Sequence, residues 1–493
     1  MIQRLLQTIT SIADKDPDRV AIVDNNRSRT YREFHSAIGL AAVELKSIQL
    51  YPGDRVGILL ENSFDAFVYI YACLMNGLVY VPLSPSEPHS RLTTMIRKSG
   101  LKALVRKNPD ETISLSSLSG FQTTSVAMPS TDPILYLLFT SGTTGEPKGI
   151  YISESNVNHF CEWAIQKFQI SKSDVILGHI NLTFDLSVFH LFVPFIKGAS
   201  VRITPPTLER IAPGEQLKNG VTIAMLVPRM TGLLAEAGYL KAGDFPSLRH
   251  ILFCGEKLDA YQVLQWQRCN PGTSVHNLYG PTEATVACSC FSMAPGCTPA
   301  DPIPIGRPIG KMKFDIQPVA RDESDSAEHM GELVISGPQV TRFAYLLNDP
   351  APTLRNRGEY LSGDLVRSDG NGLYYWISRL DDQIKIQGHR VELSEIESRL
   401  ATNGFAMEVV CTFDQPSERI VAFFKLTNTA DQHPISEKSA IEELRKICQS
   451  ELPSHMHPSL YIQVASIPLT KNGKTDKAAL KKRYLEQQSE RGR

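Results

Sequence analysis

The stretch FTSGTTGEPKGI, residues 139–150, contains three glycines, three threonines, one serine and one lysine within twelve positions. Such a segment is too polar and too flexible to form a protein core. It follows the apolar run 134–139, ILYLLF, which predicts a buried strand that leads into a loop. Glycines let the backbone approach an anion closely, so N–H groups, hydroxyls and Lys148 can surround phosphate oxygens. The spacing is not that of a Walker A loop, because Pro147 and Gly149 flank the lysine.

The bulk composition is that of an ordinary globular protein with two or three folding units, since 42% of the 493 residues are hydrophobic and 21% are charged. The 51 basic and 52 acidic side chains leave a net charge of −1, so neither nucleic acid nor a membrane surface is an expected partner. No apolar run is long enough for a membrane span, and the amphipathic N-terminal segment does not read as a secretion signal. Nine cysteines without metal-binding spacing favour reduced thiols in the cytoplasm.

Short β-branched runs alternate with amphipathic stretches along most of the chain. The run 54–60, DRVGILL, precedes the helical pattern 64–77, and the same alternation returns beyond residue 220. Strands that alternate with helices predict parallel pairing and an α/β architecture. From Asp301 to Trp376 short strands separated by Gly, Pro and Asp predict a β-rich part. We place the domain boundary near Asp381 and expect one domain over residues 1–380 and a smaller one over residues 381–493.

The chain resembles the adenylate-forming (ANL) superfamily, which contains peptide-synthetase adenylation domains, acyl-CoA synthetases and luciferases. The resemblance runs nearly end to end and keeps the family's motif order. The stretches that carry it are RTYREF, NGLVYVPLSPSEPHSR, LLFTSGTTGEPKGI, NLYGPTEATV, GELVISG, YLSGD, SRLDDQIKIQGHRVELSEIE and LTKNGKTDKAAL. The family's fold is α/β: a large N-terminal domain of two α/β subdomains plus a β-barrel-like subdomain, and a small mobile α+β C-terminal domain. The resemblance therefore implies an AMP-forming enzyme that uses ATP and Mg²⁺.

The resemblance also assigns residues to ATP. Two sets of residues are implied, one for the phosphates and one for the nucleoside. The phosphate-binding set is Thr140, Ser141, Gly142, Thr143, Thr144 and Lys148. The nucleoside set is Asn277 and Tyr279 at the adenine, and Asp364 and Arg379 at the ribose. A packed aromatic is the alternative reading of Tyr279, and Leu361 and Ser362 stand where relatives carry a basic residue and Thr.

The reacting groups are assigned in the same way. Thr282 is expected to face the α-phosphate and Glu283 to ligate Mg²⁺, since a hard cation needs oxygen ligands. Lys474 is the expected catalytic lysine, because a cation there stabilises the charge that develops in displacement at phosphorus. Glu154 stands where relatives commonly have histidine, and the sequence does not explain this change.

Asp185, in the segment INLTFDLSVFHLF, resembles the aspartate that pairs with the substrate's α-ammonium in amino-acid-activating members. Acyl- and aryl-activating members lack it, since an uncharged substrate would leave a buried carboxylate unpaired. The remaining pocket positions are all apolar and imply a small aliphatic amino acid. They are Leu186, Phe189, Met230, Leu252, Cys254, Leu278, Val286 and Ala287. The pocket motifs are closest to D-alanine:carrier protein ligases and next to L-prolyl:carrier protein ligases, and neither the amino acid nor its enantiomer is settled by these residues.

We expect a stand-alone ligase that delivers its aminoacyl group to the phosphopantetheine thiol of a separate carrier protein. Asp381 is the expected hinge of the small domain, and Gly388 is expected on the side that meets the pantetheine arm. The rivals are an acyl- or aryl-CoA ligase of the same superfamily and a catalytically silent nucleotide-binding homologue.

Overall fold

The computed structural model describes most of the chain, and the chain divides into two compact units. The described residues are 1–118, 132–141, 146–204, 213–299, 301–319, 329–342, 354–355, 358–381, 383–386, 388–401, 408–415, 417–426, 436–468, 475–477, 479–482 and 484. The first unit comprises residues 1–85, 96–139 and 149–380, and the second comprises residues 86–95, 140–148 and 381–493. Gly142, Thr143, Thr144 and Lys474 lie outside the described residues.

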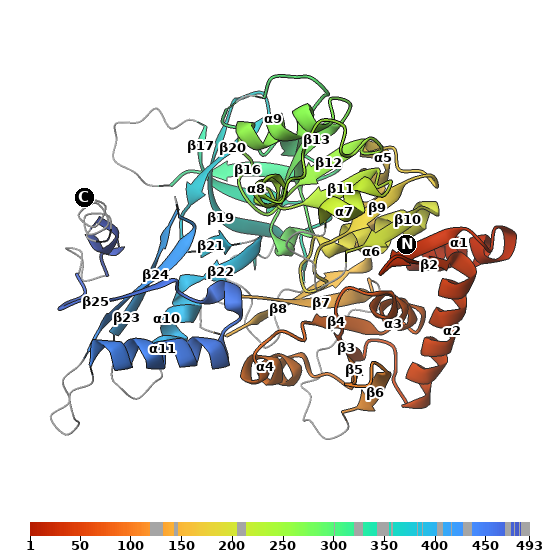
Figure 1. The fold of residues 1–493 in the computed structure, drawn as a ribbon, viewed down its shortest axis with the longest axis horizontal. Coiled ribbons are helices and arrows are strands. Elements are labelled where there is room, and N and C mark those ends of the chain that lie inside the picture. Colours follow the sequence, from red (N-terminus) through yellow and green to blue (C-terminus); the bar gives the residue numbers. More distant parts are fainter. Residues whose placement is uncertain are drawn as a thin grey trace. The chain divides into compact units, whose positions relative to one another are not determined.

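The largest sheet in the described part of the first unit joins strands from both ends of that unit (Figure 1). In spatial order its strands are β15 (Arg307–Pro308), β14 (Ser289–Met293), β13 (Ser274–Tyr279), β12 (His250–Phe253), β11 (Ile223–Leu226), β9 (Val175–Gly178), β10 (Ser200–Ile203), β1 (Val20–Asp24) and β2 (Arg27–Thr30). The strands from β13 to β1 pair in parallel, and β1 lies beside β10 with Ile22 opposite Val201. The Tyr31 hydroxyl donates to the Ala199 carbonyl at 2.6 Å and strengthens the same junction.

A second sheet of the first unit contains the strand that leads into the expected phosphate-binding loop. Its order is β6 (Ile113–Ser117), β5 (Ala103–Lys107), β3 (Arg55–Leu59), β4 (Val79–Leu83), β7 (Ile134–Thr140) and β8 (Lys148–Ser153). β5, β3, β4 and β7 pair in parallel, so the expected parallel α/β pattern is confirmed in both sheets.

Helices separate and cover these sheets. They are α1 (Ile2–Lys15), α2 (Tyr31–Ser47), α3 (Phe64–Met75), α4 (His89–Ser99), α5 (Glu154–Lys167), α6 (Ser187–Lys197), α7 (Pro213–Lys218), α8 (Met230–Glu236) and α9 (Ala260–Cys269). α3 contacts β3 and β4 of one sheet and β1 of the other, while α6 contacts β9 and β10. α2 begins with a reciprocal cap in which Thr30 and Glu33 satisfy each other's backbone N–H groups. None of the described helices is long and apolar enough to cross a membrane.

The expected β-rich part is an antiparallel sheet in the described residues. Its strands are β16 (Lys313–Gln317), β17 (Met330–Ser336), β18 (Leu354–Arg355), β19 (Glu359–Ser368) and β20 (Tyr374–Arg379). β20 pairs with β19 so that Arg379 lies opposite Asp364.

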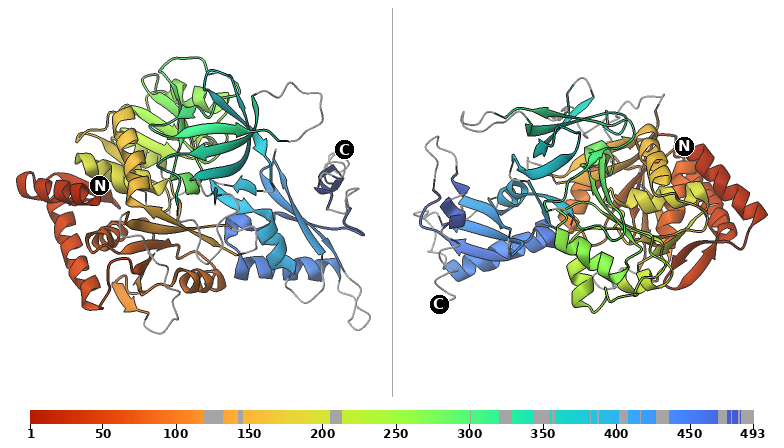
Figure 2. Two further views of the ribbon diagram at one scale, coloured as in Figure 1. Left: turned by 180° about the vertical axis from the view of Figure 1, so that it is seen from behind. Right: turned by 90° about the horizontal axis from the view of Figure 1, so that it is seen from above.

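The second unit is a small α+β assembly (Figure 1 and Figure 2). Its elements are β21 (Gln383–Ile386), β22 (His389–Glu392), α10 (Leu393–Ala401), β23 (Glu408–Asp414), β24 (Arg419–Lys425), α11 (Glu437–Glu451), a short 3₁₀ turn η3 (Ser454–Met456) and β25 (Leu460–Gln463). Alternate residues of β24 face opposite sides, so Ala422 packs with α10 and α11 while Phe423 packs with Leu480. A buried ion pair between Arg91 and Glu395 ties the segment 86–95 to this unit.

Candidate functional site

A buried carboxylate, Asp364 of β19, lies at the centre of a hydrogen-bonded cluster in the first unit. The Tyr279 hydroxyl donates to Oδ2 of Asp364 at 2.5 Å, and the Trp376 indole nitrogen donates to Oδ1 at 2.8 Å. Arg379 Nη1 lies 3.1 Å from Oδ1 and also donates to the Ser362 carbonyl at 2.7 Å. Burial first, and then the charge of Asp364, raises the pKa of Tyr279 well above its ordinary value, so its hydroxyl stays a donor. The cluster brings together three of the residues assigned to the nucleoside.

Trp376 reaches this cluster because of a one-residue irregularity between β19 and β20. Leu365 pairs with Ser378, but the next residue, Val366, pairs with Trp376, which leaves Ile377 as the extra residue. Side chains alternate between the two faces of a strand, so a shift of one residue reverses the face. The irregularity therefore places the Trp376 indole on the same face as Asp364. Nothing in the sequence marked Trp376 beyond its position three residues before Arg379.

Asn277 and Tyr279 end β13, and the residues after them form a tightly packed turn. Asn277 Nδ2 donates to the Pro304 carbonyl at 2.8 Å. A Cβ atom on Gly280 would lie 2.7 Å from Ala287 Cα and 2.8 Å from the Val286 carbonyl oxygen, so only glycine fits there. The turn leads into the 3₁₀ helix η2 (Thr282–Ala284), where Glu283 is 1% exposed.

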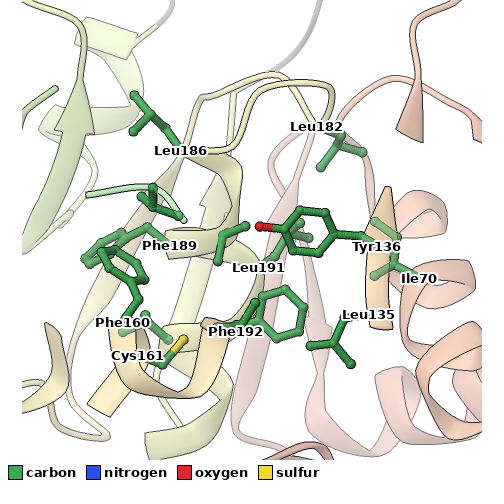
Figure 3. Packing of buried hydrophobic residues seen from close by; sticks show 14 of the residues in the cluster. Ile70, Leu135, Tyr136, Phe160, Cys161, Leu182, Leu186, Phe189, Leu191 and Phe192 are labelled. Atoms are coloured by element: carbon green, nitrogen blue, oxygen red, sulfur yellow. The ribbon is translucent and has the colours of Figure 1, made fainter. Parts of the chain in front are cut away.

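Asp185 lies in the connection between β9 and α6 and is only 4% exposed. Its backbone carbonyl accepts from the Val188 N–H at 3.0 Å, which fixes the start of α6. The Tyr136 side chain of β7 is fully buried, and its hydroxyl has no hydrogen-bond partner among the described residues. Figure 3 shows this hydroxyl directed toward α6. Burial first, with a contribution from the charge of Asp185, raises the pKa of Tyr136 well above its ordinary value. A neutral donor and a buried carboxylate therefore occupy the same region of the core.

The apolar residues assigned to the substrate come from separate elements of the first unit. Seven of them belong to one buried cluster, namely Leu186, Phe189, Leu252, Cys254, Leu278, Val286 and Ala287. Figure 3 shows Leu186 and Phe189 from the α6 side of this cluster. Met230 instead belongs to a second cluster around α8 and α9. The Cys254 thiol faces the Val286 carbonyl at 3.9 Å, which links β12 to the segment after η2.

The remaining assigned residues belong to the second unit. Ser141 Oγ donates to the Arg390 carbonyl at 2.8 Å, and the Thr140 hydroxyl is buried without a partner among the described residues. Lys148 begins β8. Asp381 accepts the Gln383 N–H at 3.2 Å, and Gly388 has a φ of 80° in the turn between β21 and β22, where glycine is favoured. The other assigned residues, Gly142, Thr143, Thr144 and Lys474, lie outside the described part of the chain.

Glu154, which stands where relatives commonly have histidine, has a contact that sequence reasoning did not foresee. It is the first residue of α5, and its Oε1 accepts the Ile2 N–H at 2.9 Å. An acidic side chain in the first helical turn also interacts favourably with the helix dipole. The glutamate therefore joins the first turn of α1 to the start of α5.

The chain is similar to known proteins over most of its length. Residues 9–345 match the model of the AMP-binding enzyme family. Zwittermicin A synthase ZmaJ of Bacillus cereus is 31% identical, with 94% of this chain and 92% of that protein covered. The L-proline--[L-prolyl-carrier protein] ligase of Streptomyces coelicolor is 30% identical over 91% of this chain and 90% of that protein.

A solved structure is also similar over nearly the whole chain. The Vibrio cholerae adenylation domain AlmE, in complex with glycyl-adenosine-5'-phosphate, is 25% identical with a TM-score of 0.79. The alignment covers 98% of this chain and 97% of that chain. The ordered motifs, the two sheets with parallel central strands and these matches lead to one conclusion: the chain belongs to the AMP-binding enzyme family.

Proposed function

We propose that this enzyme activates a small apolar amino acid as its aminoacyl-adenylate and then loads it on the phosphopantetheine thiol of a carrier protein. The observation that carries the proposal is Asp185, a carboxylate buried beside an otherwise apolar cluster. A carboxylate carries the charge that matches the α-ammonium of an amino acid, and water screens such a pair only weakly at a buried position. The seven assigned side chains of that cluster are apolar, so none of them pairs with a charged substrate side chain.

The activation step needs the substrate carboxylate, ATP and a cation. The carboxylate oxygen attacks the α-phosphorus, the bond to the bridging oxygen breaks, and pyrophosphate leaves. Asp364 and Arg379 are proposed to hold the ribose, Tyr279 and Asn277 the adenine, and Thr282 the α-phosphate. The residues from Thr140 to Lys148 are proposed to bind the outer phosphates, and Lys474 to stabilise the charge on the α-phosphate.

Glu283 fits the role of a magnesium ligand. Mg²⁺ in nucleotide enzymes is usually held by one or two carboxylates together with phosphate oxygens and water. Glu283 supplies one carboxylate, 1% exposed, in the 3₁₀ helix that follows Tyr279 and Gly280. When bound, the cation offsets the negative charge of the leaving pyrophosphate.

In the transfer step the carrier thiol gives its proton to solvent and its sulfur attacks the carbonyl carbon of the adenylate. The bond from that carbon to the phosphate oxygen breaks, and AMP leaves. Asp381 is proposed as the hinge for this step, and Gly388 as the glycine that leaves room for the pantetheine arm. The nine free cysteines suit a cytoplasmic location.

The proposal names two candidate substrates of different size. An alanine-like substrate, including D-alanine, fits the residue types of the cluster, and the glycyl adenylate bound by AlmE also favours a small substrate. L-proline is the second candidate, favoured by the similarity to the Streptomyces coelicolor prolyl ligase.

ATP–pyrophosphate exchange tests the proposal. The panel contains both enantiomers of alanine, proline, serine and valine, together with fatty and aryl acids. We expect exchange with a small apolar amino acid and none with the simple acids. Exchange with simple acids alone would identify an acyl- or aryl-CoA ligase, and no exchange with any acid would identify a silent nucleotide-binding homologue.

The variant Asp185→Asn tests the residue on which the proposal rests. Loss of a hydrogen bond to a charged group costs about 1.5–3 kcal/mol, so kcat/KM for the amino acid should fall roughly 10- to 150-fold while the KM for ATP is kept. Asp174→Asn is the matched control, because Asp174 is equally buried and bonds Arg249 and Thr222 instead. Unchanged amino-acid kinetics in Asp185→Asn would contradict the assignment.

A further inference from the structure

The segment between η2 and β14 has a backbone conformation that its residues do not favour. Thr285 and Val286 both have positive φ angles, 55° and 69°, and neither is glycine. Positive φ is unfavourable for any residue with a Cβ and most of all for a β-branched one. Such a conformation persists only where the surrounding structure holds it.

Gln339, which follows β17, supplies this restraint. Its side chain is fully buried, and its Nε2 donates to the carbonyl oxygens of Ala284 at 3.2 Å, Thr285 at 3.0 Å and Ala287 at 2.7 Å. The Thr285 hydroxyl in turn donates to the Gln339 backbone carbonyl at 2.7 Å. One side chain therefore satisfies the carbonyls on both sides of Val286, and the contact is reciprocal.

The orientation of the Gln339 amide is fixed by His159 of α5. The Lys311 backbone N–H donates to His159 Nε2 at 3.0 Å, so this nitrogen must be an acceptor. In the neutral ring the proton then lies on Nδ1, which donates to Gln339 Oε1 at 2.8 Å. The amide nitrogen consequently faces the three carbonyls, and the reverse orientation would set oxygen against oxygen.

We propose that Gln339 is a positioning residue that sets the substrate selectivity of this enzyme by holding residues 284–287 in place. The inference rests on the proposed function, because Val286 and Ala287 are assigned to the amino-acid pocket. The same segment follows Glu283, whose carbonyl accepts the Thr341 N–H at 2.9 Å. Residues 339–341 thus hydrogen-bond both to residues 284–287 and to Glu283, the candidate magnesium ligand.

The variant Gln339→Met tests this inference, since it keeps the length of the side chain and removes all of its hydrogen bonds. Gln267→Met is the matched control, because Gln267 is also buried but its amide donates to the Ala294 carbonyl and the Cys297 sulfur, not to residues 284–287. We expect the KM for the preferred amino acid to rise about tenfold or more. The ratio of kcat/KM for this amino acid to kcat/KM for an amino acid one or two methylenes larger should fall by a similar factor. The KM for ATP should stay within about twofold of the wild-type value, and Gln267→Met should keep both constants.

A second readout does not depend on activity. Hydrogen–deuterium exchange of the N–H groups of Thr285, Ala287 and Cys288 should accelerate at least about tenfold in Gln339→Met and not in Gln267→Met. If the wild-type enzyme fails to exchange pyrophosphate with any amino acid, the proposed function is refuted. Faster deuterium uptake in Gln339→Met would still support the positioning role in that case. Unchanged deuterium uptake, or an equal loss of activity toward every substrate without a change in preference, would overturn the inference.

His159→Leu provides the same test if Gln339→Met does not fold. It removes the donor to Gln339 Oε1 and leaves the amide nitrogen in place. The changes in KM, in substrate preference and in deuterium uptake should therefore have the same direction as in Gln339→Met but be smaller. Wild-type selectivity together with wild-type deuterium uptake in this variant would overturn the inference.

Discussion

Removal of the Asp364 carboxylate should lower the free energy of unfolding, because this carboxylate accepts hydrogen bonds from the Tyr279 and Trp376 side chains. In Asp364→Ala the Tyr279 hydroxyl, on a side chain that is 8% exposed, loses its acceptor, which costs about 1–3 kcal/mol. The Trp376 N–H also loses its acceptor, but its side chain is partly exposed and water can replace the carboxylate, so about 1 kcal/mol is expected there. Arg379 keeps the Ser362 carbonyl. The free energy of unfolding should therefore fall by roughly 2–4 kcal/mol.

Asp364→Asn separates this structural role from the proposed binding role. The amide oxygen can still accept from Trp376, and the Tyr279 hydroxyl can accept from the amide nitrogen, so the loss of stability should be about 1 kcal/mol or less. The ribose hydroxyls that Asp364 is proposed to bind would lose a charged acceptor, so the KM for ATP should rise roughly 10- to 150-fold. Denaturant unfolding and pyrophosphate exchange measure the two effects, with Asp315→Asn on the exposed face of β16 as the control. Unfolding of Asp364→Ala at the wild-type denaturant concentration, or a wild-type KM for ATP in Asp364→Asn, would refute the reasoning.

Three further substitutions have distinct expected results. Gly280→Ala forces a Cβ against the backbone of Val286 and Ala287, so the free energy of unfolding measured with denaturant should fall by about 1–3 kcal/mol. The KM for the amino acid should rise more than the KM for ATP. Unfolding at the wild-type denaturant concentration would contradict the close contact of Gly280 with this backbone. Burial, with the charge of His179 second, lowers the pKa of His190 to about 3, below its unfolded value of about 6.5. Because only the unfolded state is then protonated, stability is full above about pH 6.5 and falls by up to about 1.4 kcal/mol per pH unit below it. His190→Leu should remove this part of the acid sensitivity, and an unchanged difference between unfolding at about pH 7 and about pH 5 would count against it. Lys474→Ala should abolish amino-acid-dependent pyrophosphate exchange while ATP still binds. Lys471→Ala, at the neighbouring lysine of the same LTKNGKTDK motif, should retain exchange. Near-normal exchange in Lys474→Ala would exclude its catalytic role.

Much of the fold could be predicted because its determinants are local. Runs such as 79–83 and 250–253 are strands because β-branched and aromatic side chains occur there between turn residues. Strands separated by amphipathic stretches pair in parallel, since the connection must cross the sheet. The motif order likewise pointed to Tyr279, Asp364 and Arg379 together, and these residues do lie in one cluster.

What the sequence could not supply are contacts that depend on register or on distant segments. Trp376 faces Asp364 only because Ile377 is an extra residue in the pairing of β20 with β19, and no spacing rule marks such an irregularity. Gln339 reaches carbonyls more than fifty positions earlier in the chain, and a lone glutamine after Gly-Pro has no distinguishing pattern. Met230 was grouped with the other apolar pocket positions by motif, but it packs in another cluster, with α8 and α9.

The pairing of β1 with β10 has a consequence for the order in which the newly made polypeptide can fold. Ile22 and Val201 are neighbours in the sheet. The strand formed by roughly the first thirty residues therefore has no partner in β10 until the ribosome has added about 180 more residues. During that interval the edge of the early hairpin has no strand to cover it, and its apolar face is open to chaperones and to other nascent chains. Biosynthesis of this enzyme is therefore most vulnerable to aggregation early, before β10 has emerged.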